Sequence, residues 1–290
     1  MEKSLFVPKE RLAQFMSGAS MNHQYGIQLY CTGDLEKLQA LVPPQMKVMD
    51  LGLNPDKPQG MIYIYVVNIR EPTFGPWYME GGVGLMCEMN GKSGVHFLGL
   101  QLSGPGAIMG MLSGRESSGL PKKMCECIHV ERVGDEGHCY IERGGVRILD
   151  VVCEVGKYNI PATAQALFQE QDSCTPEHFV DASGSCLLFK HRLAGGFDAL
   201  DVMYYDSPTL YKSWEPISAK VTLTSSADDP WGEIPVNTVL GGGWMVSDNR
   251  VNSCTTIYSY PKDEVMDAMQ YLFTGRYDQC TLEKQHQIYE

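Results

Sequence analysis

The sequence has no long hydrophobic run, no internal repeat and no low-complexity linker. A membrane helix needs about 20 consecutive apolar residues, and the longest apolar candidate, residues 61–69, is long enough only for a strand. The first residues carry charges of both signs where a signal peptide would be apolar. These absences predict a soluble, cytoplasmic protein without a membrane span.

Positive charge is also scarce. Lysine and arginine together number 23 against 35 acidic residues, which gives a net charge of −12. Proteins that bind nucleic acid carry a basic patch, and the pair Lys122-Lys123 is too small to form one. We therefore expect no nucleic-acid partner. We also expect an anionic substrate to be held by local cations in a shielded pocket, because the negative field of the whole protein would oppose its approach.

Cysteine is plentiful, with ten residues, but the expected compartment is reducing, so we interpret the cysteines as free thiols. Cys125, Cys127 and His129 alternate and would share one face of a strand. Structural zinc needs four ligands, and no second pair follows at the usual spacing. We therefore predict no metal and interpret these three residues as core packing.

The local patterns predict a mainly β (α+β) protein. Helix signals occur in four places: Pro8–Met16, Leu35–Val42 with Asp34 as its cap, Asn159–Gln171, and the segment after Pro261. Runs rich in β-branched and aromatic residues predict ten strands: Tyr25–Cys31, Met61–Ile69, Gly94–Leu102, Ile128–Val133, Cys139–Glu142, Val146–Cys153, Cys186–His191, Val202–Tyr205, Ala219–Leu223 and Cys254–Tyr260. We expect one mostly antiparallel domain over residues 1–290, closed or nearly closed, with helices outside it. A division near residue 180 has no linker to support it.

The segment with the clearest chemistry contains Lys122 and Lys123 after Pro121, in largely apolar surroundings. A lysine forms a covalent bond with a carbonyl substrate only when its amine is neutral, and the ordinary lysine pKa of about 10.4 must then fall by several units. A second ammonium about 6 Å away supplies roughly 3 kcal/mol, or about two units, and neighbouring residues on a strand point to opposite faces. Desolvation must therefore supply much of the shift. Taken alone, the dipeptide is more typical of solvated surface lysines.

The wider segment, Gly114-Arg-Glu-Ser-Ser-Gly-Leu-Pro-Lys-Lys-Met124, resembles the signature of the acetoacetate decarboxylase family, in which Gly-Arg-Glu leads through Pro-Lys-Lys. Tyr78-Met-Glu80-Gly-Gly82 is similar to the Tyr-x-Glu-x-Gly element of that family. Weaker likeness in residues 25–44 and from Pro235 through the helix after Pro261 extends the resemblance over roughly residues 20 to 275.

The resemblance implies a Schiff-base lysine at Lys122, with Lys123 helping to keep it neutral and Glu80 as the acid/base carboxylate. It implies decarboxylation of a β-keto acid through an imine and an enamine, with no metal or organic cofactor. It also implies a conical, closed antiparallel β-barrel with peripheral helices, and assembly into a homo-oligomer.

The sequence departs from the family at the substrate carboxylate. Gln24, preceded by His23, stands where these decarboxylases have an arginine, and an amide can hydrogen-bond a carboxylate but cannot neutralise it. Residues 61–69 lack a second acidic residue. Arg70 either replaces the missing cation or is a solvated residue at a strand end. Gln24 and Arg70 are therefore the substrate-binding candidates for a small oxo acid.

These departures leave two alternatives to decarboxylation. One is an aldolase-dehydratase that uses the same lysine imine on oxo acids. The other is a non-catalytic binder of a hydrophobic ligand on the same fold.

Two further motifs have structural interpretations. Arg115 and Glu116 are expected to form a structural ion pair. Residues 241–244, Gly-Gly-Gly-Trp, are not followed by Lys-Ser/Thr as in a phosphate loop, so they let the backbone approach another group closely or form a turn.

Overall fold

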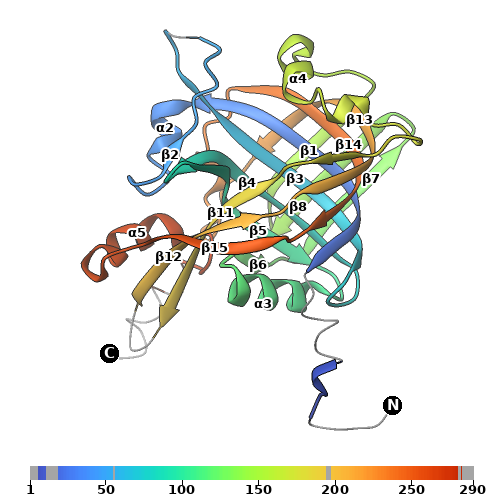
Figure 1. Cartoon of the computed structure of the whole chain (residues 1–290). Coiled ribbons are helices and arrows are strands. Elements are labelled where there is room, and N and C mark those ends of the chain that lie inside the picture. Colours follow the sequence, from blue (N-terminus) through green and yellow to red (C-terminus); the bar gives the residue numbers. More distant parts are fainter. Residues whose placement is uncertain (1–5, 11–18, 55, 194–196, 280–281, 283–290) are drawn as a thin grey trace.

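Strands dominate the computed structural model, which describes residues 6–10, 19–54, 56–193, 197–279 and 282 (Figure 1). The strands are β1 (Ser20–Asp34), β2 (Lys47–Val48), β3 (Gln59–Pro72), β4 (Tyr78–Met89), β5 (Lys92–Ser103), β6 (Lys122–Met124), β7 (Cys127–Val133), β8 (Glu136–Arg143), β9 (Val146–Val155), β10 (Val180–Ala182), β11 (Ser185–Leu193), β12 (Phe197–Asp206), β13 (Thr209–Leu223), β14 (Thr238–Arg250) and β15 (Ser253–Ser259). The helices are α2 (Leu35–Gln39), α3 (Ala107–Ser117), α4 (Pro161–Leu167) and α5 (Val265–Leu272), with short 3-10 turns η1 (Gln171–Ser173), η2 (Trp231–Glu233) and η3 (Lys262–Glu264).

All these strands belong to one sheet, whose main path runs β15-β12-β11-β5-β4-β3-β1-β14-β13-β9-β8-β7. The pairs are antiparallel except β5 with β6 and β5 with β11. The predicted mainly β architecture with peripheral helices is confirmed. The predicted closure is not seen in the strand pairing of the described residues, since the path ends at β15 and β7. Strand β7 instead contacts β3, β4 and β5 across the interior.

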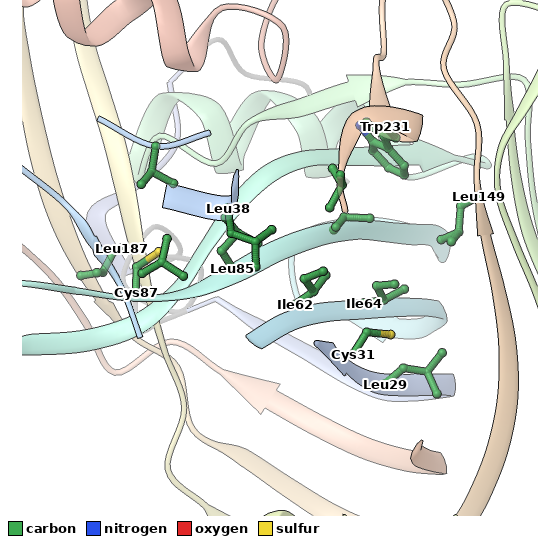
Figure 2. Close-up of a cluster of buried hydrophobic side chains, with 14 of the residues drawn as sticks. Leu29, Cys31, Leu38, Ile62, Ile64, Leu85, Cys87, Leu149, Leu187 and Trp231 are labelled. Carbon is green, nitrogen blue, oxygen red and sulfur yellow. The ribbon is translucent and has the colours of Figure 1, made fainter. Parts of the chain in front are cut away.

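The strands β1, β3 and β4 are buried on both faces, which determines where the core and the cavity lie. Alternate residues, such as Leu29, Ile64 and Leu85, point to a core face where buried apolar side chains pack together (Figure 2). The intervening residues form a second face, which we call the cavity face. Since the side-chain period of a strand is two residues, the same strands supply both surfaces.

The predicted helices are found with shorter bounds. Asp34 caps α2 by accepting a hydrogen bond from the Lys37 amide at 3.1 Å. In α5, Val265, Met269 and Leu272 are buried along one stripe, as expected. The helix predicted over residues 8–16 lies outside the described residues from position 11 onward.

The sequence patterns missed three long elements, the strands β4 and β14 and the helix α3. The helix contains Gly110 and Gly114 and has no continuous apolar stripe. Residues 241–243 are not a turn but lie within β14. A Cβ on Gly242 would lie 1.9 Å from the carbonyl oxygen of Gln28, so this glycine permits close approach to the paired strand β1. Within the described residues, no helix has the length and apolar character that crossing a membrane requires.

Candidate active site

A cavity of about 400 Å³ lies between the cavity face and α3. Its wall is aromatic and polar, and it includes Gln24, Gln28, Tyr30, Tyr63, Tyr65, Phe97, Glu80, Lys122, Tyr205, Tyr211 and Met245. Among the described residues that line it, only Glu80 and Lys122 belong to the charged residue types. A pocket of this size and composition is typical of a small-molecule site.

Lys122 reaches the cavity from β6, a short strand that pairs in parallel with β5. Its alkyl chain lies against α3, where a Cβ on Gly114 would be 3.1 Å from Cδ and Cε of the lysine. The ammonium group lies 3.4 Å from the carbonyl oxygen of Gly110. The two glycines of α3 therefore make room for the lysine, and only 6% of its side chain is exposed.

The rest of the Gly-Arg-Glu to Pro-Lys-Lys segment holds the backbone of Lys122. Arg115 donates hydrogen bonds of 3.0 Å to the carbonyl oxygens of Lys122 and Arg276. Gly119 has φ +87°, and a Cβ there would lie 2.4 Å from the carbonyl oxygen of Phe189. Arg115 is thus structural, but its partners are carbonyl groups and not the predicted Glu116, which is exposed.

Glu80 projects from β4 onto the same cavity. Its Oε2 lies 2.7 Å from Nζ of Lys122, and 10% of its side chain is exposed. Its other oxygen accepts a hydrogen bond from the hydroxyl of Tyr65 on β3. Burial and the nearby Glu80 carboxylate hold the pKa of Tyr65 well above its ordinary value, so the hydroxyl stays a donor. One proton can pass between Lys122 and Glu80 within the buried pair.

Lys123 lies in a different environment from Lys122. Its Nζ contacts Asp229 at 2.7 Å and Asp278 at 3.3 Å, and it donates to the carbonyl oxygen of Asp228 at 2.9 Å. Arg143 binds the same two carboxylates. Lys123 therefore joins β6 to two later segments of the chain, and the structure brings its ammonium to acidic groups rather than to Lys122.

The two predicted substrate-binding residues are separated. Gln24 is 9% exposed and lines the cavity, after a bulge in β1 at which His23 has φ +51°. Arg70 does not line the cavity within the described residues. Its guanidinium lies 4.5 Å from the ring centroid of Tyr25 and 3.4 Å from the imidazole of His23. The geometry therefore keeps Gln24 as a substrate-binding candidate and gives no support to Arg70.

Sequence reasoning missed most of the polar cavity wall. Tyr63 and Tyr65 alternate on β3, and Gln28 and Tyr30 alternate on β1 in register with them. The alternation was visible in the sequence, but both strands are apolar on the other face as well. The pattern therefore did not distinguish a cavity from a second core face.

No group of three or more His, Cys, Asp or Glu side chains in the described part of the chain is arranged to hold a metal. The interpretation of Cys125, Cys127 and His129 as core packing is confirmed for Cys125, which packs against the hydrophobic core, and is wrong for Cys127 and His129, which are half-buried on β7 outside it. Cys125 precedes β7 and donates to the carbonyl oxygen of Leu102, whereas His129 stacks on Tyr140 with ring centroids 4.7 Å apart.

The family model of acetoacetate decarboxylase (ADC) matches residues 7–261 of the chain. The chain belongs to the acetoacetate decarboxylase family. This match confirms the resemblance that residues 114–124 and 78–82 indicated, and it covers most of the chain.

Proteins similar to this chain are named for different activities. A "CLA biosynthesis isomerase" of Lactiplantibacillus plantarum is 28% identical over 285 residues, which are 95% of each chain. The acetoacetate decarboxylase structure from Legionella pneumophila has a TM-score of 0.65 at 15% identity, over 84% of this chain and 88% of that one. The enduracididine biosynthesis enzyme MppR in complex with pyruvate has a TM-score of 0.59 at 12% identity, over 89% and 93% of the two chains. The structural matches show a shared fold.

Proposed function

We propose that the protein is an enzyme that binds a ketone covalently at Lys122 and shifts a double bond next to that ketone. The observation that carries the proposal is the buried Lys122–Glu80 pair, 2.7 Å apart in a cavity wall that is otherwise uncharged in the described residues. A neutral amine is the nucleophile of imine chemistry, and an adjacent carboxylate can accept and return protons.

The reaction needs only these two groups and water. Lys122 transfers a proton to Glu80, and its neutral amine attacks the ketone carbon. The ketone oxygen then takes up the proton held by Glu80 and one proton from the amine, and it leaves as water. The resulting iminium draws electrons from the neighbouring C–H bond. Glu80 removes that proton to give a conjugated enamine and returns it two carbons farther along, so the double bond moves. Hydrolysis of the iminium releases the isomer and restores Lys122.

Two observations favour isomerisation as the outcome. Apart from Lys122 itself, no described residue of the cavity wall offers a cation for a carboxylate beside the reacting ketone, and Gln24 supplies only an amide. The relative that matches 95% of this chain is named an isomerase. The same iminium would also support loss of CO2 from a β-keto acid, which the family membership favours as a second candidate.

Reduction with borohydride tests the imine. The wild-type chain is incubated with a β,γ-unsaturated methyl ketone and borohydride, and mass spectrometry is expected to find the reduced adduct at Lys122. Lys122→Met should give no adduct, whereas Lys220→Met, which changes an exposed lysine on β13, should react like the wild type. An unmodified Lys122 in the folded wild-type protein would refute the covalent mechanism and favour the ligand-binder alternative.

NMR in D2O separates the possible reactions. Double-bond migration supports isomerisation, and substrate hydrogen retained at the receiving carbon indicates that Glu80 carries the proton there without exchange with the solvent. Release of CO2 from a β-keto acid supports decarboxylation, and condensed products from pyruvate and an aldehyde support the aldolase-dehydratase alternative. Assembly into a homo-oligomer stays a prediction, which light scattering of the purified chain tests.

A further inference from the structure

The cavity has a second polar region besides Lys122 and Glu80, on the strands β1, β3 and β13. Gln28 on β1 is 7% exposed and Tyr211 on β13 is 3% exposed. The Tyr211 hydroxyl donates a 2.7 Å hydrogen bond to Oε1 of Gln28. Both side chains line the same cavity as Lys122, together with Tyr30 and Tyr63.

Tyr30 adds a phenol hydroxyl to this region. Its ring contacts that of Tyr63, with centroids 5.6 Å apart, and both side chains line the cavity. Burial raises the pKa of Tyr30, and a side-chain hydrogen bond with Gln28 offsets part of that effect.

Tyr63 adds a second donor. Its ring contacts those of Tyr30 and Tyr65, with centroids 5.6 Å and 5.7 Å apart, and it lines the cavity. Burial raises the pKa of all three phenols, so they remain protonated at neutral pH. Buried hydroxyl donors that lack an acceptor are costly unless a ligand or water supplies one.

The sheet register places this region apart from the reacting lysine. Lys122, Leu100, Gly82, Tyr65 and Gln28 are paired in one row across β6, β5, β4, β3 and β1. Four strand spacings amount to about 19 Å between the Cα atoms, measured along the curved sheet. The Glu80–Tyr65 hydrogen bond lies between the two ends of this row, so a ligand that contacts both Lys122 and Gln28 must extend past that pair.

We infer that Gln28, Tyr30, Tyr63 and Tyr211 form a second substrate subsite, which binds an oxygen acceptor of the substrate several carbons away from its ketone. The acceptor is a carboxyl or an ester group, both of which present the same carbonyl oxygen to the phenol donors. The inference rests on the proposed function for the position of the ketone. It extends that function by naming the substrate class, a ketone with a distant carbonyl oxygen and an apolar spacer.

Three sets of compounds test the subsite: methyl ketones with a terminal carboxylate and spacers of increasing length, their methyl esters, and unsubstituted methyl ketones of matched length. Calorimetry measures non-covalent binding, and borohydride trapping measures the adduct at Lys122. At the best spacer length, a compound with the second oxygen should half-saturate the wild type at about tenfold lower concentration than its matched ketone, as two net hydrogen bonds imply. Comparing the acid with the ester identifies which form is bound.

Tyr30→Phe and Tyr63→Phe should each remove much of this preference. Tyr204→Phe is the matched control, because that ring is half-buried beside the Lys92 ammonium and does not line the cavity. Equal binding of all three compound sets, or an unchanged preference in both cavity variants, would overturn the subsite. A preference in calorimetry without any adduct would instead support the subsite and refute the imine.

Discussion

The two faces of β1, β3 and β4 carry out different tasks with the same backbone. On the core face, side chains such as Leu85 and Ile64 are fully buried and apolar. On the cavity face, Glu80 and Tyr65 are nearly as buried but polar and hydrogen-bonded to each other. Burial is therefore not what distinguishes a functional position in this protein. The distinction lies in whether a buried side chain has polar partners, because such groups cost free energy unless they are paired.

Substitution of Glu80 gives the largest effect expected on the cavity face. Glu80→Gln keeps the shape of the side chain but removes the carboxylate that carries the proton. The turnover rate per folded molecule should fall by about 10²–10⁴, measured by NMR with the unsaturated ketone. Thermal unfolding of the same sample is the control. A rate within twofold of the wild type would mean that Glu80 is not the acid/base group.

The matched change on the core face of the same strand is Leu85→Ala. Leu85 is 0% exposed, so its truncation leaves a cavity and should lower the free energy of unfolding by about 2–5 kcal/mol. Denaturant titration measures the loss. Turnover per folded molecule should stay near that of the wild type, and a large loss of turnover at temperatures where the variant is folded would contradict the separation of the two faces.

The free energy of unfolding should depend on pH through His96, a titratable residue behind the cavity wall. His96 on β5 is 4% exposed, its Nδ1 lies 3.2 Å from the carbonyl oxygen of Leu187, and burial lowers its pKa to about 4. Between pH 6.5 and pH 4 the unfolded chain therefore binds more protons at this site than the folded chain. Stability should fall as pH is lowered through this window, by up to about 3 kcal/mol from His96.

His96→Gln should flatten that part of the stability curve, measured by urea unfolding at several pH values. His191, whose pKa burial also lowers to about 4, supplies a similar contribution that the variant retains. An unchanged slope in His96→Gln would show that the imidazole is already accessible to protons in the folded state.

The smallest expected effect concerns the support of Glu80. Tyr65→Phe removes the hydroxyl that donates to the carboxylate and should slow turnover about tenfold, the value of one hydrogen bond to a charged group. The pH profile of the rate should also move, because a carboxylate that loses a donor is a stronger base. A slower enzyme with an unmoved profile would indicate that Tyr65 contributes packing alone.

Much of the fold followed from local patterns. Runs rich in β-branched and aromatic residues predicted the strands around residues 25–31 and 61–69, and Asp34 predicted the start of α2. The helix α3 was not predicted, because Gly110 and Gly114 disfavour a helix locally. Their use becomes clear only when Lys122 is seen to pass beside them.

The sequence by itself determined the family signature from Gly114 to Met124 and the two candidates Lys122 and Glu80, because a motif with fixed spacing can be found without knowing its surroundings. Only the tertiary structure decided their partners. Strand pairing across β4, β5 and β6 brings Glu80 to Lys122, and the segment before η2 brings Asp229 to Lys123. Gln24 and Arg70 lie on paired strands, but of the two only Gln24 lines the cavity. The physical reason is that electrostatic and hydrogen-bond partners are chosen by distance in space, and here they come from segments that are far apart along the chain.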